Sequence, residues 1–427
     1  MNNTALSRRD FVKLVGAGTA LSIAGCATTA REGSAGRVVV IGGGYGGATA
    51  AKYIRQWSDG RVEVVLIEPN TQFVSCPLSN LVLGGTKRIE DLTLPYSNLP
   101  KYGVKVVRDE VTVVDAETKR VRLQSGEEIP YDRLVVSPGI DFIFSDLPGL
   151  NNAEAQKLVL HAWKAGPDTV ALRRQLEAMP DGGTYILSIP KAPYRCPPGP
   201  YERACQVASY FKGAKPKSKV LVLDANEDLV SKKGLFTASW NDLYKGIIEY
   251  RPSQEAKDVD VKGMTVKTEF DSFKGDVLNV LPPQRAGVIA QQAKLVTANN
   301  RWCGVDWRTM ESIAVPGIHV LGDSTLAAPA MPKSGSMANN HAKICASAVV
   351  ALLTGQPTNP QPIINNTCYS YVSGTEAMHV TSIHRYDPAQ KTLVTVPGSG
   401  GVSSQRSELE KQYADNWAQS IWADTLG

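Results

Sequence analysis

Uninterrupted apolar runs alternate along this chain with segments of helical periodicity. Such runs are typical of parallel strands that are buried on both faces, and they predict strands at residues 37–41, 62–67, 183–189 and 219–224. Helical periodicity predicts helices at residues 48–56, 201–211 and 339–353. Alternating strands and helices predict an α/β fold built on parallel sheets.

The first predicted strand runs directly into a glycine-rich turn. Gly42, Gly44 and Gly47 stand at the three glycine positions of a G-x-G-x-x-G loop, and the second strand ends at Glu68. Strand, glycines, helix, strand and acid in this order are typical of a dinucleotide-binding unit. The helix N-terminus would hold the pyrophosphate, and Glu68 would bind the adenosine ribose hydroxyls.

Two distant segments favour FAD as the dinucleotide. Residues 131–139 and 317–323 are similar to segments of disulfide-reductase-like flavoproteins, in which the second segment ends at an aspartate that bonds the ribityl chain. Asp323 is therefore a predicted cofactor residue. The helix near residues 339–353 would aim its positive N-terminus at the flavin.

This spacing predicts a fold of two doubly wound Rossmann-like domains and a C-terminal α+β domain. The FAD domain would be discontinuous, because its two parts flank a second Rossmann-like domain. The expected boundaries are 36–150 and 300–355 for the FAD domain, 151–299 for the inserted domain, and 356–427 for the C-terminal interface domain.

The second Rossmann-like unit lacks a phosphate-binding loop. Its strand-to-helix connection reads Arg-Cys-Pro-Pro-Gly-Pro-Tyr-Glu-Arg-Ala over residues 195–204. Pyrophosphate binding needs bare backbone N–H groups and close approach, whereas proline has no N–H and a fixed φ. The loop argues against NAD(P)H and favours a thiol site at Cys196. The alternative is that the prolines only shape a tight turn.

This loop strongly resembles a segment of the flavoprotein subunit of flavocytochrome c sulfide dehydrogenase. Residues 161–166, 282–287, 331–335 and 366–370 carry the same resemblance. The resemblance implies that Cys196 and Cys368 form a redox-active disulfide at the flavin, with an inert structural disulfide as the alternative. It also implies that Cys76 is joined to the flavin 8-methyl group by a thioether, so that FAD is covalently bound. A buried structural thiol is the alternative for Cys76.

Two further side chains are candidates for the same site. Glu202 lies six residues after Cys196 and is a candidate proton acceptor or donor for hydrosulfide, although an acid in the first turn also stabilises a helix. Lys333 is a candidate for the isoalloxazine edge, with a solvated surface lysine as the alternative. We expect Cys205, Cys303 and Cys345 to be structural, and Cys303 to lie in a polar turn.

The resemblance implies an enzyme that oxidises sulfide to sulfane sulfur or polysulfide through the disulfide and FAD. No Cys-x-x-Cys-His motif occurs, so this chain carries no covalent haem, and electrons would pass to a separate c-type cytochrome subunit in a heterodimer. One rival is a sulfide:quinone oxidoreductase, although residues 408–422 are too charged for a convincing membrane-facing helix. A second rival is a non-catalytic sulfur-carrier flavoprotein.

The N-terminus carries Arg8 and Arg9 ahead of a short apolar run. This pattern predicts a twin-arginine export signal over residues 1–30 and a periplasmic protein. A basic N-terminal helix or membrane anchor is the alternative, and Cys26 offers a lipoprotein acylation site. No apolar run approaches the ~20 residues of a transmembrane helix.

Charge and histidine content exclude other classes of partner. Residues 1–30 hold three basic residues and one acidic residue, so their removal lowers the formal net charge from +5 to +3. This balance is no signature of a nucleic-acid-binding protein. The five histidines show no metal-ligand spacing.

Overall fold

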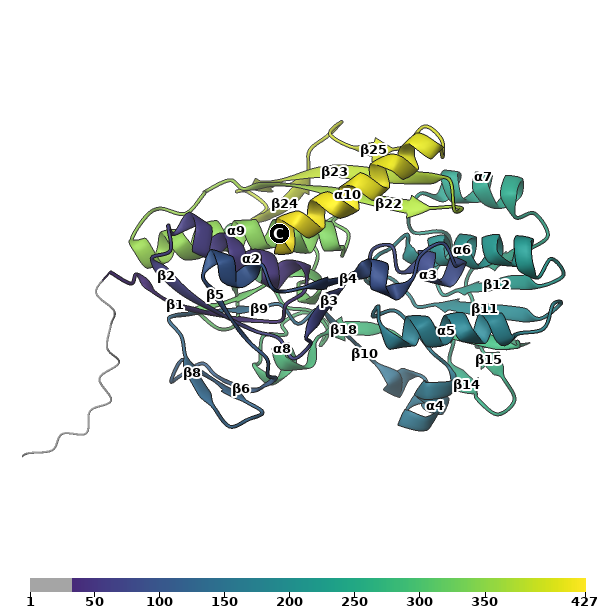
Figure 1. Ribbon diagram of the computed structural model, residues 1–427, viewed down its shortest axis with the longest axis horizontal. Helices are drawn as coiled ribbons and strands as arrows, with labels where there is room; N and C mark the ends of the chain where they lie inside the picture. Colours follow the sequence, from purple (N-terminus) through teal and green to yellow (C-terminus); the bar gives the residue numbers. More distant parts are fainter. Residues whose placement is uncertain (1–32) are drawn as a thin grey trace, which may run out of the picture. The chain divides into compact units, whose positions relative to one another are not determined.

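The computed structural model describes residues 33–427, and residues 35–427 form one compact body (Figure 1). The predicted export signal and the acylation site at Cys26 lie outside the described residues. No helix within residues 33–427 is both long enough and apolar enough to cross a membrane. The expected domain boundaries at residues 150, 300 and 355 stay predictions.

The first sheet joins the two ends of the predicted FAD domain. Its seven strands run in the order β19-β20-β21-β9-β1-β2-β5. The bounds are β1 Gly36–Ile41, β2 Val62–Ile67, β5 Val104–Val107, β9 Arg133–Val136, β19 Val305–Asp306, β20 Glu311–Ser312 and β21 Ile318–Val320. Parallel pairing of β21 with β9, and of β9 with β1, brings residues near 320 beside residues near 40. The discontinuous Rossmann-like fold is therefore confirmed.

Two helices that pack against each other belong to this sheet. They are α2 Tyr45–Trp57, which follows β1, and α9 Gly335–Thr354, which follows β21 (Figure 1). Helix α9 begins four residues earlier than the sequence predicted. The reason is that the Ser334 hydroxyl accepts a hydrogen bond from the Met337 N–H and caps the helix there.

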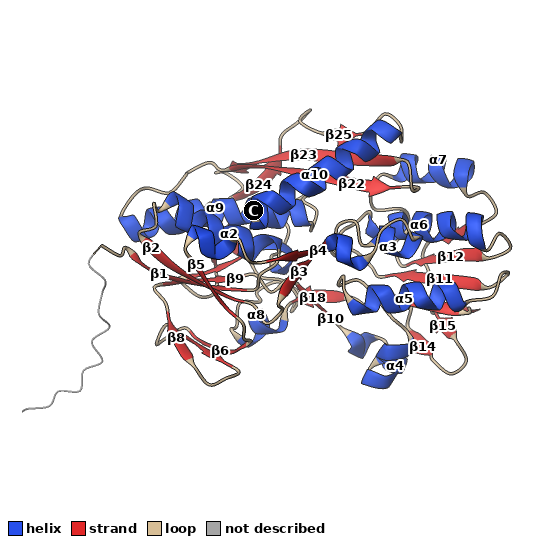
Figure 2. Ribbon diagram, viewed as in Figure 1, coloured by secondary structure: helices blue, strands red, loops and turns tan. Residues whose placement is uncertain are grey.

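The inserted Rossmann-like unit has a four-stranded parallel sheet of order β13-β12-β11-β17. Its strands are β11 Thr184–Ile189, β12 Lys219–Asp224, β13 Ile248–Arg251 and β17 Val277–Val280, and its helices are α5 Pro167–Ala178, α6 Gly199–Ala214 and α7 Lys233–Leu243 (Figure 2). Helix α6 follows β11 through the proline-rich loop. The second doubly wound unit is thus confirmed, with its strand-to-helix loop at the carboxyl edge of the sheet.

The C-terminal part is an antiparallel sheet with one long helix. The strands are β22 Ile363–Tyr371, β23 Ala377–Asp387, β24 Thr392–Thr395 and β25 Gly401–Val402, and the helix is α10 Glu408–Leu426. Helix α10 packs on β22 and β23 and reaches α2 of the first unit. The predicted C-terminal α+β arrangement is confirmed.

Short elements complete the described chain. They are β3 Gln72–Val74, β4 Thr93–Pro95, β6 Val111–Asp115, β7 Arg120–Leu123, β8 Glu128–Pro130, β10 Ile140–Phe142, β14 Asp258–Asp260, β15 Thr265–Lys267, β16 Ser272–Lys274, β18 Gln284–Ala286, α3 Asn80–Gly84, α4 Ala153–Leu158 and α8 Val288–Gln292. Strand β10 pairs with β18 and so joins the segment after β9 to the segment after β17. Helix α3 packs against α5 and α6.

Candidate active site

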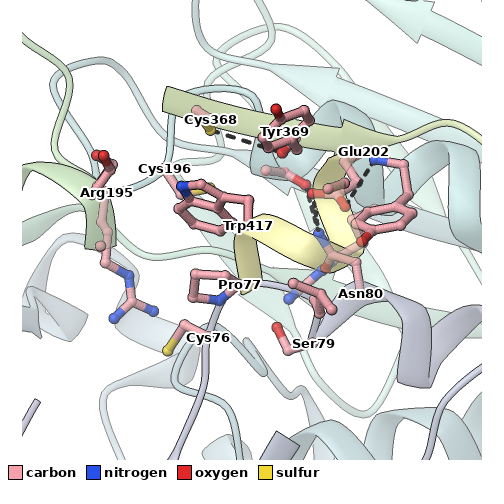
Figure 3. Close-up of a pocket in the computed structure, with 18 of the residues that line it drawn as sticks. Cys76, Pro77, Ser79, Asn80, Arg195, Cys196, Glu202, Cys368, Tyr369 and Trp417 are labelled. Carbon is pink, nitrogen blue, oxygen red and sulfur yellow. Dashed lines mark hydrogen bonds between the residues drawn. The ribbon is translucent and has the colours of Figure 1, made fainter. Parts of the chain in front are cut away.

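One cavity gathers side chains from segments that are far apart in the sequence (Figure 3). Its wall includes the segment from Cys76 to Asn80, the loop before α6, the first turn of α9, strand β22 and helix α10. Most of these segments are strand ends or helix starts, where side chains of several elements converge. The cavity is therefore the candidate active site.

The structure brings Cys196 and Cys368 together in this cavity. Cys196 lies in the loop before α6, and Cys368 lies in β22 opposite Val380. Both are thiols here, rather than the disulfide implied by the resemblance, and the two thiols hydrogen bond to each other. Their side chains are partly exposed. The pair is close enough for thiol–disulfide chemistry.

The loop holds Cys196 in an unusual backbone conformation. Its φ is +57°, in the left-handed region that non-glycine residues seldom adopt. The Cys196 N–H donates to the Lys333 carbonyl at 2.8 Å, and its carbonyl accepts from the Gly199 N–H at 2.9 Å. These two bonds fix the direction of the thiol toward β22.

Gly199 is the residue that makes room for this thiol. A Cβ at position 199 would stand 2.9 Å from Cys196 Sγ and 2.7 Å from an indole ring carbon of Trp163. The Trp163 ring is buried and lines the cavity, and its N–H has no partner among the described residues. A buried N–H donor without a partner, on a residue that lines the cavity, suits an anionic ligand.

The two thiols differ in acidity. The hydrogen bond between them raises the pKa of Cys196 well above its usual range and lowers the pKa of Cys368. Burial and nearby Glu202 raise the pKa of Cys196 further, whereas the Lys232 ammonium lowers that of Cys368. Cys368 is thus the thiol that ionises more readily.

Glu202 lies in the first turn of α6 with its carboxyl buried beside the pair (Figure 3). Its two oxygens accept hydrogen bonds from the Tyr371 N–H at 3.1 Å and from Asn80 Nδ2 at 3.3 Å. Burial raises the pKa of Glu202 to about 7, and the charge on Cys368 acts in the same direction. A carboxyl poised near neutral pH is suited to general acid–base work.

Arg203 and Asn80 fix the α6 end of the cavity. Arg203 is buried and donates to the carbonyls of His161 and Ala162 at 2.8 and 2.7 Å and to Asn80 Oδ1 at 3.0 Å. Its guanidinium lies 4.8 Å from the Trp163 ring centroid. These bonds tie the 161–163 segment to α6. The sequence motif contains Arg203, but nothing in the sequence pairs it with residue 161.

The glycine loop has the geometry of a phosphate-binding turn. Gly42 has φ +94°, and a Cβ at Gly47 would stand 1.8 Å from the Gly42 carbonyl oxygen. Apart from its chain neighbours, no atom of residues 33–427 lies within 4 Å of the Cβ position at Gly44, the N-cap of α2. The α2 N-terminus is therefore open to an anionic ligand, and the pyrophosphate at this position stays a prediction.

Glu68 stands at the end of β2, where the sequence predicts the ribose-binding acid. Its carboxylate accepts from the Gly43 N–H at 2.7 Å and from the Asn70 N–H and side-chain amide at 2.8 and 2.6 Å. The acid is thus anchored against the glycine loop, where an adenosine ribose would lie.

Asp323 and Lys333 lie near the start of α9. One buried Asp323 oxygen has no hydrogen-bond partner among the described residues, as expected of a group whose partner is a cofactor hydroxyl. Lys333 is buried rather than solvated. Its Nζ donates to the Asp323 carbonyl at 3.0 Å and lies 3.7 Å from the Trp302 ring centroid, and burial lowers its pKa to about 7. These residues fit a dinucleotide such as FAD.

Cys76 lies at the edge of the same cavity, below Pro77 in Figure 3, with the Arg195 side chain nearby. It is a partly exposed thiol. A hydrogen bond between Arg195 and Cys76 is one of the interactions that raise the pKa of Arg195. The thiol is thus free for attachment to a cofactor on the side of the cavity away from Glu202.

The carboxyl end of β12 explains why a nicotinamide dinucleotide is not expected here. Asp224 occupies the position of a ribose-binding acid in a Rossmann unit. Its carboxylate is buried and already accepts hydrogen bonds from Tyr201 at 2.8 Å, Tyr250 at 3.0 Å and Asn226 at 2.7 Å. Tyrosine hydroxyls thus take the place of ribose hydroxyls.

The three remaining cysteines are buried. Cys205 and Cys345 lie in helices α6 and α9, as the sequence predicted. Cys303 is also fully buried, so the expected polar turn was wrong. Its neighbour Trp302 buries this segment against the core. Residues 33–427 contain no cluster of His, Cys, Asp or Glu side chains that would hold a metal ion.

Known protein families match three parts of the chain. Residues 169–282 match the central region of the sulfide dehydrogenase [flavocytochrome c] flavoprotein chain, and residues 360–426 match the flavin-binding region of flavocytochrome c sulphide dehydrogenase. Residues 36–178 match the pyridine nucleotide-disulphide oxidoreductases. A flavocytochrome c sulfide dehydrogenase flavoprotein chain from Chlorobaculum thiosulfatiphilum is 59% identical over 46 residues, covering 11% of this chain and 94% of that one.

This chain is a flavoprotein of the sulfide dehydrogenase and sulfide:quinone oxidoreductase type. The mitochondrial sulfide:quinone oxidoreductase of Mus musculus is 23% identical over 67% of this chain and 65% of the mouse protein, so the match spans less than two thirds of that relative. The solved sulfide:quinone oxidoreductase of Aquifex aeolicus has the same fold, with a TM-score of 0.73 at 18% identity over 91% of each chain. FAD is the cofactor that the family and the glycine loop, Glu68 and Asp323 support together.

Proposed function

We propose that this flavoprotein oxidises sulfide to sulfane sulfur through the Cys196–Cys368 pair and FAD, and that a c-type cytochrome subunit receives the electrons. The observation that carries this proposal is the meeting of two thiols and a buried carboxyl in one cavity. A thiol pair of unequal acidity suits the exchange of sulfur between a disulfide and hydrosulfide.

Residues of this chain react with the sulfur nucleophile and accept its proton. Hydrosulfide attacks one sulfur of the oxidised pair, and the other sulfur leaves as a thiolate. Glu202 accepts the proton of the incoming sulfide, because its pKa of about 7 lets it change protonation state near neutral pH. Trp163 lines the same cavity, and its buried N–H, which has no partner among the described residues, would bind the anionic sulfur.

FAD, when bound, accepts electron pairs and releases them singly. Gly42, Gly44 and Gly47 would hold its pyrophosphate, and Glu68 and Asp323 its hydroxyl groups. Lys333 would lie toward the isoalloxazine ring. We further propose that the Cys76 thiol is the covalent attachment point, since it is partly exposed at the cavity wall.

The choice of acceptor rests on the two matches to flavocytochrome c sulfide dehydrogenase regions and on the C-terminal helix. Helix α10 carries the charged residues Glu408, Glu410, Lys411, Asp415 and Asp424, and its apolar residues Ala414, Ala418 and Ile421 are buried, whereas Leu409 and Tyr413 are exposed. Two exposed apolar side chains among acidic residues form no continuous apolar face for a membrane. Quinone as the acceptor is favoured instead by the mouse and Aquifex relatives.

Location follows from the same proposal. A c-type cytochrome partner suits export, and Arg8 and Arg9 provide the motif of a twin-arginine signal that carries folded, cofactor-loaded proteins. We therefore propose a periplasmic heterodimer.

Steady-state assays with the purified holoprotein test the acceptor. Sulfide-dependent reduction of cytochrome c, abolished by Cys196→Ser and by Cys368→Ser, is the expected result. Quinone reduction without cytochrome reduction would replace the cytochrome proposal by a sulfide:quinone oxidoreductase. If sulfide does not reduce the flavin at all, the remaining hypothesis is a non-catalytic sulfur carrier.

A further inference from the structure

Lys232 is a buried cation beside the cysteine pair that the proposed function leaves without a role. It immediately precedes α7 and has φ +51°, with only 7% of its surface exposed. Its Nζ donates to the Cys368 carbonyl at 2.9 Å and to the Ser370 hydroxyl at 2.8 Å. The ammonium group is thus fixed against β22 at Cys368.

A buried ammonium group is costly unless an anion lies nearby. Both hydrogen-bond acceptors of Lys232 are neutral. The anionic groups that act on it are Cys368, Glu202 and Cys196, in this order, and then Glu410 from α10. Glu202 is itself held partly protonated near neutral pH by burial. The pair of cysteines is therefore the principal source of compensating charge.

Cys196 and Cys368 do not share this cation equally. Lys232 hydrogen bonds to the backbone of Cys368. The Glu202 carboxyl disfavours negative charge on both thiols, and the Arg195 guanidinium is the cation that favours negative charge on Cys196. The titratable groups facing Cys368 are Cys196 from the loop before α6, Glu202 from α6, and Lys232 from the start of α7. Only the last is a cation.

We propose that Lys232 is a positioning residue that keeps the negative charge of the opened cysteine pair on Cys368 rather than on Cys196. The inference rests on the proposed function, because it concerns the pair that hydrosulfide opens. It selects which sulfur leaves, since the better-stabilised thiolate is the faster leaving group.

The resulting step is balanced. The sulfur of HS⁻ forms a bond with Cys196 Sγ, and the Cys196–Cys368 S–S bond breaks. The electron pair of that bond leaves on Cys368 Sγ, which is reduced to a thiolate, while the substrate sulfur is oxidised to the persulfide level on Cys196. One negative charge is present before and after the step. When the substrate enters as H₂S, Glu202 takes the additional proton.

Pulsed alkylation of the holoprotein tests the proposal. The pair is reduced with a phosphine, treated briefly with iodoacetamide at a series of pH values, and analysed by peptide mass spectrometry. At neutral pH we expect Cys368 to react at least about tenfold faster than Cys196, since thiolates are the reactive form and a nearby cation favours them. Faster reaction of Cys196 in the unaltered protein would overturn the proposal.

Three substitutions separate a charge effect from a structural one. Lys232→Met should slow Cys368 alkylation at neutral pH about tenfold and move its profile to higher pH, and Lys232→Arg should retain the original profile. Lys233→Met is the matched control, because Lys233 is an exposed neighbour that pairs with Asp228. An unchanged Cys368 profile in Lys232→Met would contradict the proposal.

Alkylation does not depend on sulfide turnover, so the two proposals fail separately. A protein that alkylates selectively at Cys368 but does not oxidise sulfide would refute the proposed function alone. A protein that oxidises sulfide with Cys196 as its ionised thiol would refute the role of Lys232 alone.

Discussion

The side chains around the two cysteines give each thiol a different environment within one cavity. Lys232 lies beside Cys368 and donates hydrogen bonds to the Cys368 carbonyl and the Ser370 hydroxyl. Cys196 lies in a strained loop beside the Glu202 carboxyl. The two thiols therefore differ in acidity, although they lie in the same cavity. Substitutions of Glu202 and Gly199, which lie next to the two thiols, test how these surroundings act on the reaction.

Glu202→Gln retains the acceptor for the Tyr371 N–H but cannot ionise. The base acts in its deprotonated form, so kcat of the unaltered protein at saturating sulfide should rise as the pH rises through about 7. In Glu202→Gln we expect kcat to fall about a hundredfold and this step in the profile to vanish. Retention of the step would assign it to another group.

Gly199→Ala places a methyl group against Cys196 Sγ and the Trp163 ring. We expect sulfide oxidation to fall by at least about tenfold, because small misplacement of reacting groups is costly, while flavin binding is retained. Gly213→Ala in the same helix is the matched control, since its Cβ position is open, and it should be active and slightly more stable. Equal activity of the two variants would contradict this reading of the loop.

The residues proposed to react could be predicted from the sequence, but the residues that position them could not. Cys196, Cys368 and Glu202 stand in recognisable motifs, and the structure brings all three into one cavity. Lys232 and Cys368 are 136 positions apart in the sequence, and no local sequence pattern predicts their contact. Burial of Lys333 was likewise hidden, because its surroundings come from Trp302 and Thr325 in the preceding segment.

Helix α10 is the element that joins the C-terminal sheet to the FAD-binding unit. At one end it presents Ala414 and Trp417 to the cavity, and His379 of β23 contacts Glu410 at 2.7 Å. At its other end, Asp424 pairs with Lys343 of α9 at 2.8 Å and accepts from Asn339 at 2.7 Å. The helix is therefore anchored on both sides of the cavity wall.

Asp424→Ala removes the anchor on α9. We expect the free energy of unfolding to fall by about 1–3 kcal/mol in denaturant titrations. Against the effect of burial, hydrogen bonds from Lys343, Tyr53 and Asn339 hold the pKa of Asp424 below its usual value. The stability difference should therefore be present at neutral pH and shrink as acid protonates Asp424. Gln419→Ala, on the exposed face of α10, is the control and should be nearly neutral.

Long apolar runs made the parallel strands predictable, because β1, β2 and β11 are buried on both faces. The strands of the C-terminal sheet are mixed in burial, and β22 alternates exposed and buried residues only over its first half. Their order depends on pairing with β23 rather than on any local pattern. The sequence therefore predicted the class of this region without its individual strands.

At the scale of the whole molecule, the cavity is where all three parts of the fold meet. The FAD-binding unit contributes Cys76 and Ser334, the inserted unit contributes Cys196 and Glu202, and the C-terminal part contributes β22 and α10. A cofactor bound to Cys76 would be held by the covalent chain even when these parts separate.

Unfolding of the purified protein in guanidinium followed by gel filtration tests that tether. We expect flavin absorbance to elute with the polypeptide, and mass spectrometry to place the flavin on the peptide containing Cys76. Cys76→Ser should release the flavin, while Cys345→Ala, which removes a buried thiol in α9, should not. Free flavin from the unaltered protein would rule out the covalent link.

The placement of Trp417 in the cavity wall has a consequence for biosynthesis. Ribosomes deliver the cysteine loop of the inserted unit long before they deliver α10, so a nascent chain exposes both thiols without the wall that shields them. Premature oxidation or scrambling of these thiols is a hazard during that interval. On the proposed export route, folding in a reducing cytoplasm before export would protect the growing chain. Helix α10, the last segment of the cavity wall to be translated, would then cover the thiols.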